Sequence, residues 1–187
     1  MTTNLSLIKI ANERRFVLAH MNYAKLIAPM EDDRMSELRS AMGPINSIAK
    51  STPGFIWSFD DNVTTNENGC TQQQRRDVEC LHTDPLLFPQ LSLWKDIKSI
   101  QHFAYKSGHN MYYRRRKEWF CSTLPPPYSV CWWHRLVICS DENGHAVVRV
   151  PTLKEAFERC ERLRVDGPTQ EAFDFATAAN FAMPSSL

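Results

Sequence analysis

Segments typical of strands and segments typical of helices follow one another along this chain in an order that few folds accommodate. Alternating or continuously apolar runs indicate strands at residues 15–24, 55–59, 90–94, 129–139 and 146–150. Helical spacing of apolar residues occurs at residues 32–50, 96–106, 109–121 and 152–163. The order strand, helix, strand, strand, helix, strand, helix predicts an α+β, ferredoxin-like split βαβ fold, in which helices cover one face of an antiparallel sheet.

A single domain accounts for residues 1–187. This length is enough to bury a substantial core, and an aromatic content of 11% argues against disorder. One part departs from the pattern: residues 60–88 are rich in Asn, Thr, Gln and acidic residues and show no period. We expect an insertion or a lid loop there.

The boundaries of the last helix are marked in the sequence. Thr152 and Glu155 have the spacing of a capping box, and Gly167 with Pro168 stops the helix. The Phe-rich tail that starts at Glu171 is expected to pack onto the body of the domain as coil or short helix.

Charge and cysteine usage exclude several classes of protein. The chain has 22 Lys and Arg against 21 Asp and Glu, whereas a dedicated nucleic-acid binder carries a clustered basic excess. No window approaches the roughly 18 apolar residues of a membrane span, and the first residues lack the layout of a secretory signal. We therefore expect a cytoplasmic protein that binds neither nucleic acid nor membrane.

The six cysteines form no CxxC pair and no zinc spacing, so no metal site is predicted.

Polar residues share one face of the first predicted strand. In an alternating strand, His20 and Asn22 lie on the same side as Leu18. Such a face lines a cavity or an interface, or it is an exposed sheet face; both interpretations stay open.

The densest group of chemically capable side chains lies in residues 105–120. If this segment is one helix, a single stripe holds Tyr105, His109, Tyr112, Arg116 and Trp119. His109 would then act as a general acid or base or as a hydrogen-bonding group, and Arg116 would anchor a carbonyl or carboxylate. Alternatively the basic residues form a solvated face and His109 belongs to the core. Gly108 could also interrupt the helix and turn Tyr105 away.

Tryptophans form the second candidate group: Trp57, Trp94, Trp119, Trp132 and Trp133. Trp132 and Trp133 must point to opposite faces of a regular strand. One of them, together with Trp57, His20 and Asn22, could line an apolar pocket for a small molecule. The alternative is that these rings are plain core.

Common cofactor signatures are missing from the chain. It has no glycine-rich phosphate loop, no dinucleotide fingerprint, no HExxH and no GxSxG. We therefore expect no cofactor and no protein-bound metal, although a single histidine suffices to ligate haem.

Several blocks resemble a bacterial and fungal family catalogued as domain of unknown function 3291. The blocks are VLAHMN at 17–22, AP at 28–29, STPGFIW at 51–57, LSLW at 91–94, YKSGH at 105–109, RRRKEWF at 114–120, WW at 132–133, GPT at 167–169 and FDF at 173–175. This family is similar to dimeric α/β-barrel proteins that include antibiotic-biosynthesis monooxygenases. The resemblance implies a homodimer, in which a second copy covers the open sheet face. Residues 60–88 are longer and more polar than the family pattern, and residues 137–148 form an added hairpin.

The resemblance also implies a function class. Relatives with this barrel act on hydrophobic, often polycyclic, products of secondary metabolism. The leading hypothesis is a cofactor-independent cyclase or isomerase of natural-product biosynthesis that promotes a pericyclic, Diels–Alder-type ring closure. The residues expected to bind substrate are His20, Asn22, Trp57, Trp94, Tyr112, Trp119, Trp132 and Trp133, and the expected hydrogen-bond donor is His109, Arg116 or Tyr105. One alternative is a cofactor-free monooxygenase with His109 or His20 as base, and another is a small-molecule binding protein without turnover.

Overall fold

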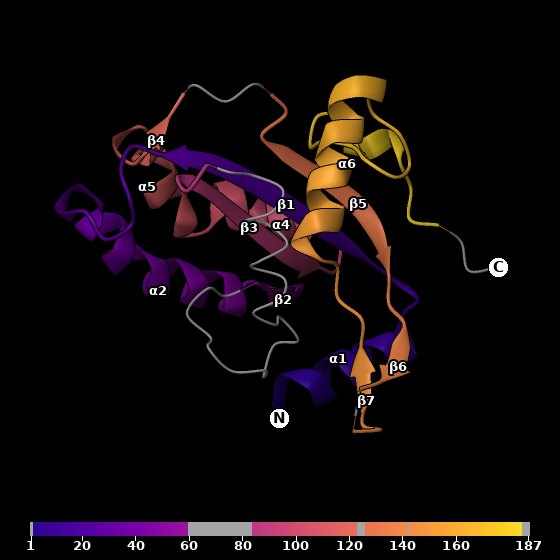
Figure 1. Ribbon diagram of the computed structural model, residues 1–187. Helices are drawn as coiled ribbons and strands as arrows, with labels where there is room; N and C mark the ends of the chain where they lie inside the picture. The colour runs from indigo at the N-terminus through magenta and orange to yellow at the C-terminus, as the bar shows by residue number, and fades with distance from the viewer. Residues whose placement is uncertain (1, 60–83, 123–125, 142, 185–187) are drawn as a thin grey trace.

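A computed structural model describes residues 2–59, 84–122, 126–141 and 143–184, and its sheet has the predicted ferredoxin-like order (Figure 1). The central strand β1 (Phe16–Leu26) pairs antiparallel with β3 (Leu87–Trp94) along one edge. Along the other edge it pairs with β5 (Ser129–Arg135) and, near its end, with β4 (Phe120–Cys121). Strand β2 (Phe55–Ser58) adds to β3. The prediction of an α+β, ferredoxin-like fold is confirmed.

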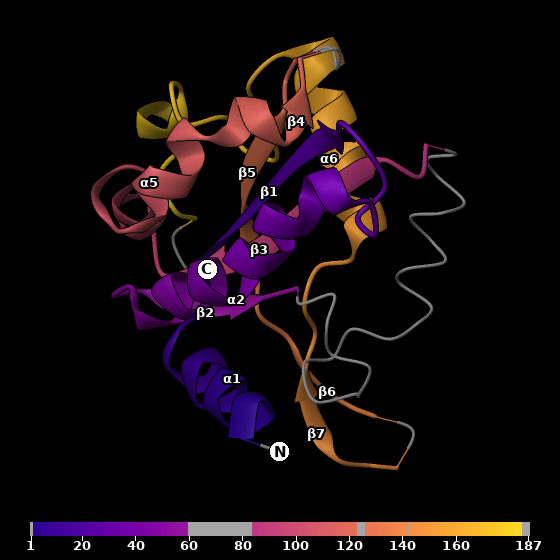
Figure 2. The same ribbon diagram turned by 90° about the vertical axis from the view of Figure 1, so that its left-hand side faces the viewer.

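Helices of the two crossover connections cover one face of this sheet. The first connection is the 3-10 turn η1 (Asp33–Met35) and α2 (Ser36–Ser51). The second contains α4 (Ile97–Gln101), the π-helical turn η3 (His102–Lys106), α5 (His109–Arg114) and the 3-10 turn η4 (Arg116–Glu118). In Figure 2 these helices lie on the opposite side of the sheet from α6 (Leu153–Asp166).

The other face of the sheet is covered by the same chain. Helix α6 packs Ala156, Phe157 and Cys160 into a core cluster with residues of β1, β3 and β5, and Leu7 of α1 (Thr2–Glu13) joins it. Helix α1 was not foreseen from the sequence. The face that a second copy was expected to cover is therefore occupied by α6 and α1.

The side chains of β1 alternate between the two faces. Val17, Ala19 and Met21 belong to the cluster under α6, while Leu18 belongs to a second cluster with Trp94 and residues of α2 and α4. A third cluster lies further along the helix-covered face, around Leu26, Phe88 and Trp119 of this chain. We call these the α6-side cluster, the α4-side cluster and the α5-side cluster.

The end of the chain is built as the sequence suggests. Thr152 caps α6 by accepting a hydrogen bond from the backbone N–H of Glu155 at 3.1 Å, and Gly167 ends the helix with φ 75°. The tail then crosses to β5, where the backbones of Phe173 and Cys131 exchange two hydrogen bonds of 2.7 and 2.9 Å. The short 3-10 turn η5 (Ala178–Asn180) follows. The tail packs onto the body, as expected.

Two departures concern the connections. Strands β6 (Ile138–Ser140) and β7 (Ala146–Val148) form the predicted hairpin, but as a separate two-stranded sheet. Strand β3 begins at Leu87, so the last residues of the expected loop 60–88 are strand. Residues 60–83 lie outside the described residues, and the lid stays a prediction.

Within the described ranges, no helix has the length and apolar content needed to cross a membrane.

Candidate functional site on the helix-covered sheet face

A band of polar side chains crosses the middle of the helix-covered face. His20 of β1 lies opposite Ser92 of β3, and the next outward pair on this face is Asn22 with Gln90. Ser129 of β5 extends the band on the other side of Asn22. The band separates the α4-side cluster from the α5-side cluster. We call these five residues the polar band.

Four side chains of the polar band have no hydrogen-bond partner within the part of the chain that the structure describes: His20, Asn22, Gln90 and Ser129. The imidazole of His20 is nearly enclosed, because the residue is only 9% exposed. Asn22 and Gln90 are half-buried at the centre of a sheet that helices cover. Since buried polar groups are normally hydrogen-bonded, these side chains are available to a ligand or to water.

Burial determines the protonation of His20. The surrounding protein disfavours the imidazolium and lowers the pKa of His20 to about 4. The hydroxyl of Ser92 contacts the backbone carbonyl of His20 at 3.4 Å and accepts the indole N–H of Trp94 at 2.8 Å, which fixes the strand pair beside it. At neutral pH, His20 is therefore an uncharged imidazole with one N–H donor and one acceptor.

Aromatic rings lead from His20 to the surface of the second crossover. The ring of Phe175 stacks on His20 with centroids 5.2 Å apart, and Tyr105 lies 6.1 Å from Phe175. The ring centroid of Tyr113 lies 6.4 Å from those of both Tyr105 and His109. Phe103 connects these rings to the sheet, because its ring centroid lies 4.4 Å from that of His109 and 5.3 Å from that of Trp94. We call these seven rings the aromatic chain.

His109 is the second neutral histidine of the aromatic chain. Its backbone N–H donates to the hydroxyl of Ser107 at 3.1 Å, and its Nδ1 lies 3.4 Å from the carbonyl oxygen of Ala104. Burial lowers the pKa of His109, and the Ala104 carbonyl opposes this only in part. His109 is half-buried, so its ring is partly open to a bound molecule.

The expectation that residues 105–119 share one helical stripe is wrong. Gly108 separates the π-helical turn from α5, and α5 ends at Arg114, after which the chain continues as a 3-10 turn. Tyr112 and Trp119 pack in the α5-side cluster, whereas the ring contacts of His109 are with Phe103 and Tyr113. Arg116 is exposed and places its guanidinium carbon 4.3 Å from the ring centroid of Tyr113.

The predicted tryptophans divide between the two faces. Trp132 and Trp133 point to opposite faces, as expected. Trp94 and Trp133 lie on the face of the polar band, and the indole of Trp133 donates to the carbonyl of Phe181 at 3.0 Å.

Trp57 and Trp132 belong to the α6-side cluster, so they do not line a common site with His20 and Asn22 as expected. For Trp57 the cause is a register shift between Phe55 and Trp57, which places these two residues on opposite faces. Strict alternation over residues 55–59 predicts Phe55, Trp57 and Phe59 on one side of the strand, and this register shift makes that prediction wrong.

Sequence reasoning missed six residues that the structure adds to the site: Gln90, Ser92, Phe103, Tyr113, Ser129 and Phe175. The alternation of Gln90 and Ser92 with Leu91 and Leu93 carried a signal, because it predicts a polar face on β3. No local signal placed Phe175 beside His20, since the tail reaches β1 only through its pairing with β5.

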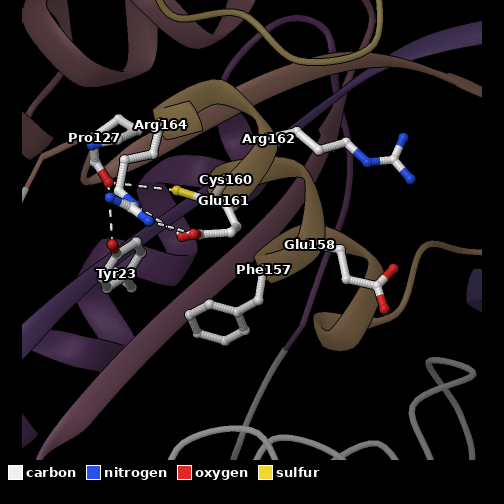
Figure 3. Close-up of a pocket in the computed structure, with 8 residues that line it drawn as sticks. All are labelled: Tyr23, Pro127, Phe157, Glu158, Cys160, Glu161, Arg162 and Arg164. Carbon is white, nitrogen blue, oxygen red and sulfur yellow. Dashed lines mark hydrogen bonds and ion pairs between the residues drawn. The ribbon is translucent and has the colours of Figure 1, made fainter. Parts of the chain in front are cut away.

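A groove of about 480 Å³ lies on the other face, along α6 (Figure 3). At its floor the Tyr23 hydroxyl and the Cys160 thiol both donate to the carbonyl oxygen of Pro127, at 3.1 and 3.4 Å. Burial raises the pKa of Tyr23 to about 12 and that of Cys160 to about 11. Both groups are protonated at neutral pH, which makes them poor nucleophiles and bases. None of the predicted site residues lines this groove.

Metal ligands do not gather at either place. Over the described ranges, no three His, Cys, Asp or Glu side chains come together as a metal site. The polar band and the aromatic chain thus offer neutral hydrogen-bonding groups beside aromatic rings, a composition typical of sites for apolar molecules with a few polar groups.

Comparison with known proteins gives a family. No curated protein and no solved structure was found to match the chain. Residues 17–185, which include the polar band and the aromatic chain, match the family described as domain of unknown function DUF3291. The chain belongs to the DUF3291 family.

Proposed function

We propose that this protein is a cofactor-independent cyclase or isomerase that binds a hydrophobic, aromatic or polyunsaturated small molecule of secondary metabolism on the polar band. The observation that carries the proposal is the neutral imidazole of His20, enclosed against Phe175 with no hydrogen-bond partner among the described residues. A desolvated donor of this kind polarises a substrate carbonyl more strongly than water does.

A pericyclic ring closure suits this composition. In a Diels–Alder-type reaction a diene and an alkene within one molecule form two carbon–carbon σ bonds at the expense of two π bonds, so no oxidant or reductant is needed. The aromatic chain would hold the reactive conformer, and orientation alone contributes several kcal/mol, on the order of 7 to 11 in the best intramolecular cases. His20, His109 or Tyr105 would donate to the carbonyl that activates the alkene.

The low basicity of the histidines argues against the cofactor-free monooxygenase. That reaction begins with removal of a proton from a substrate carbon, and a base works best when its pKa lies near the working pH. Burial lowers the pKa of His20 to about 4 and also lowers that of His109. Both groups are thus weaker bases than an ordinary histidine, whereas hydrogen-bond donation by a neutral imidazole is unaffected.

The resemblance of the family to dimeric α/β-barrel proteins supports the choice of substrate class, and a homodimer remains part of the proposal. Because α6 and α1 occupy the sheet face that a second copy covers in such barrels, a dimer of this chain would pair through other surfaces. Sedimentation equilibrium of the purified protein tests this separately from the chemistry.

The test uses the metabolite that accumulates when the gene is deleted from its host. We would isolate this compound, incubate it with the purified protein in air and under nitrogen, and follow the product mass. Conversion at unchanged mass in both gases supports the proposal. A gain of one oxygen with consumption of O₂ supports the monooxygenase, and saturable binding without conversion supports a binding protein; either would contradict the cyclase.

Variants link the reaction to the polar band. His20→Leu fills the imidazole position with an apolar side chain of similar size, and we expect it to reduce conversion at least ten-fold. His134→Gln is the matched control, because His134 is also buried but lies on the α6 side of the sheet, where its Nε2 is 3.1 Å from the Arg149 carbonyl. Equal loss in both variants would mean that folding, not the site, is affected.

A further inference from the structure

Positive charge is concentrated beside the aromatic chain. Residues 95–118 carry seven Lys and Arg but only two Asp and Glu, in a chain whose formal net charge is +1. Arg115 is neutralised by Glu37 and Glu118. Within the described part of the chain, the other cations around α5 form no ion pair: Lys106, Arg114, Arg116 and Lys117.

The same segment exposes apolar side chains. Tyr105 is 50% exposed, Met111 62% and Tyr113 41%. Exposed aromatic rings beside uncompensated cations are typical of a surface that binds a molecule with both an aromatic and an anionic part. We call Tyr105, Lys106, Tyr113, Arg114 and Arg116 the cationic rim.

Arg116 is the member of the cationic rim that the structure positions best. Its Nη1 donates to the carbonyl oxygen of Tyr113 at 3.0 Å, and its guanidinium lies over the Tyr113 ring. These two contacts hold the guanidinium plane while leaving its other N–H groups without a partner among the described residues. A fixed guanidinium with free donors matches the two oxygens of a carboxylate or phosphate.

The cationic rim is continuous with the candidate site, since Tyr105 and Tyr113 are also members of the aromatic chain that ends at His20. We infer that the ligand of this site is an anionic aromatic or polyunsaturated molecule, whose carboxylate or phosphate binds Arg116 while its apolar body lies along the aromatic chain toward His20. This inference rests on the proposed function and adds the charge of the substrate to it.

The test compares three fluorescent probes of equal ring size: anthracene-2-carboxylate, anthracene-2-carboxamide and anthracen-2-yl phosphate. We expect the carboxylate or the phosphate to bind at least ten-fold more tightly than the neutral carboxamide, and the stronger of the two identifies the anionic group. In Arg116→Met, which keeps the stem and removes the charge, this preference should fall to about one-fold. Arg162→Met on α6, which removes another exposed arginine from the other face, should keep it.

The outcomes separate the inference from the proposed function. Equal affinities for all probes, with every affinity lowered by His20→Leu, would overturn the inference and leave the site in place. Anion-dependent binding that His20→Leu does not change would overturn the proposed site. It would also overturn the inference, because the inference places the apolar body of the ligand toward His20. Tight binding of a single-stranded oligonucleotide without binding of any probe would show that the cationic rim serves another partner, and would also overturn the inference.

Discussion

The imidazole of His20 and the ring of Phe175 lie almost parallel, with 20° between their planes and 5.2 Å between their centroids. One ring belongs to the central strand and the other to the tail, 155 residues later in the chain. This contact closes the polar band on the side of the tail and removes His20 from water. The lowered pKa of His20 therefore depends on the docking of the C-terminal segment.

The stability of the protein should fall as the pH is lowered through the range set by His20. The unfolded chain binds a proton at the ordinary histidine pKa of about 6.5, while the folded protein binds it only near pH 4, so unfolding takes up a proton between these values. Lowering the pH from 7.5 to 4.5 should reduce the free energy of unfolding by about 2 to 3 kcal/mol through His20 alone.

Urea unfolding at these two pH values checks this prediction. His20→Leu should lose about 2 to 3 kcal/mol less than the wild type between them. Replacing the exposed His102 by Gln is the control and should leave the difference unchanged. A His20→Leu variant with the full wild-type pH dependence would show that His20 is not desolvated.

Removing the Phe175 ring should move the pKa of His20 back toward 6.5. Phe175→Ala opens the imidazole to water, and burial is the cause of the lowered pKa. Histidine NMR titration of the variant measures the shift directly. Phe181→Ala removes another ring of the tail, which stacks on Phe173 and makes no ring contact with His20, and the His20 titration should stay as it is. An unchanged pKa in Phe175→Ala would contradict the role given to this contact.

Substitutions of two buried tryptophans on opposite faces of the sheet should separate an effect on ligand binding from an effect on stability. Trp94 and Trp132 are 1% and 0% exposed, and each Trp→Phe change should cost on the order of 1 to 3 kcal/mol. Only Trp94→Phe should also weaken probe binding, because it removes the hydrogen bond to Ser92 beside His20. Calorimetric titration of both variants with the anthracene probes checks this. Weakened binding in Trp132→Phe alone would place the site under α6.

His109 should affect turnover more than binding. It is a half-buried neutral histidine in contact with Phe103, so His109→Ala removes a hydrogen-bonding group without emptying the core. If it donates to the substrate in the transition state, kcat should fall by about 10- to 100-fold, with little change of KM. Steady-state kinetics on the accumulated metabolite give both numbers. Full activity of His109→Ala and of Arg116→Ala, with both variants folded, would make α5 purely structural.

Much of the fold was predictable because its signals are local. The alternation in β1 places His20 and Asn22 on one face, and the spacing of Thr152 and Glu155 marks the start of α6. Trp57 was assigned to the wrong side because one extra residue in β2 exchanges the two faces of a strand, and the sequence does not mark this bulge.

The candidate site was predictable only in part because its assembly is long-range. Tyr105, His109 and Trp94 join His20 through Phe103, Tyr113 and Phe175, and the last of these arrives through the pairing of Phe173 with Cys131. Helix α5 ends at Arg114, and Trp119, beyond this break, packs in a different cluster. Helical periodicity holds within one element and does not extend across such a break.

The most direct test of the account is a histidine NMR titration of the whole protein with anthracene-2-carboxylate at neutral pH. We predict saturable shifts of the His20 and His109 ring signals, while the signal of His134 on the α6 side stays in place. Shifts of His134 with unchanged His20 and His109 signals would contradict a ligand site on the helix-covered face.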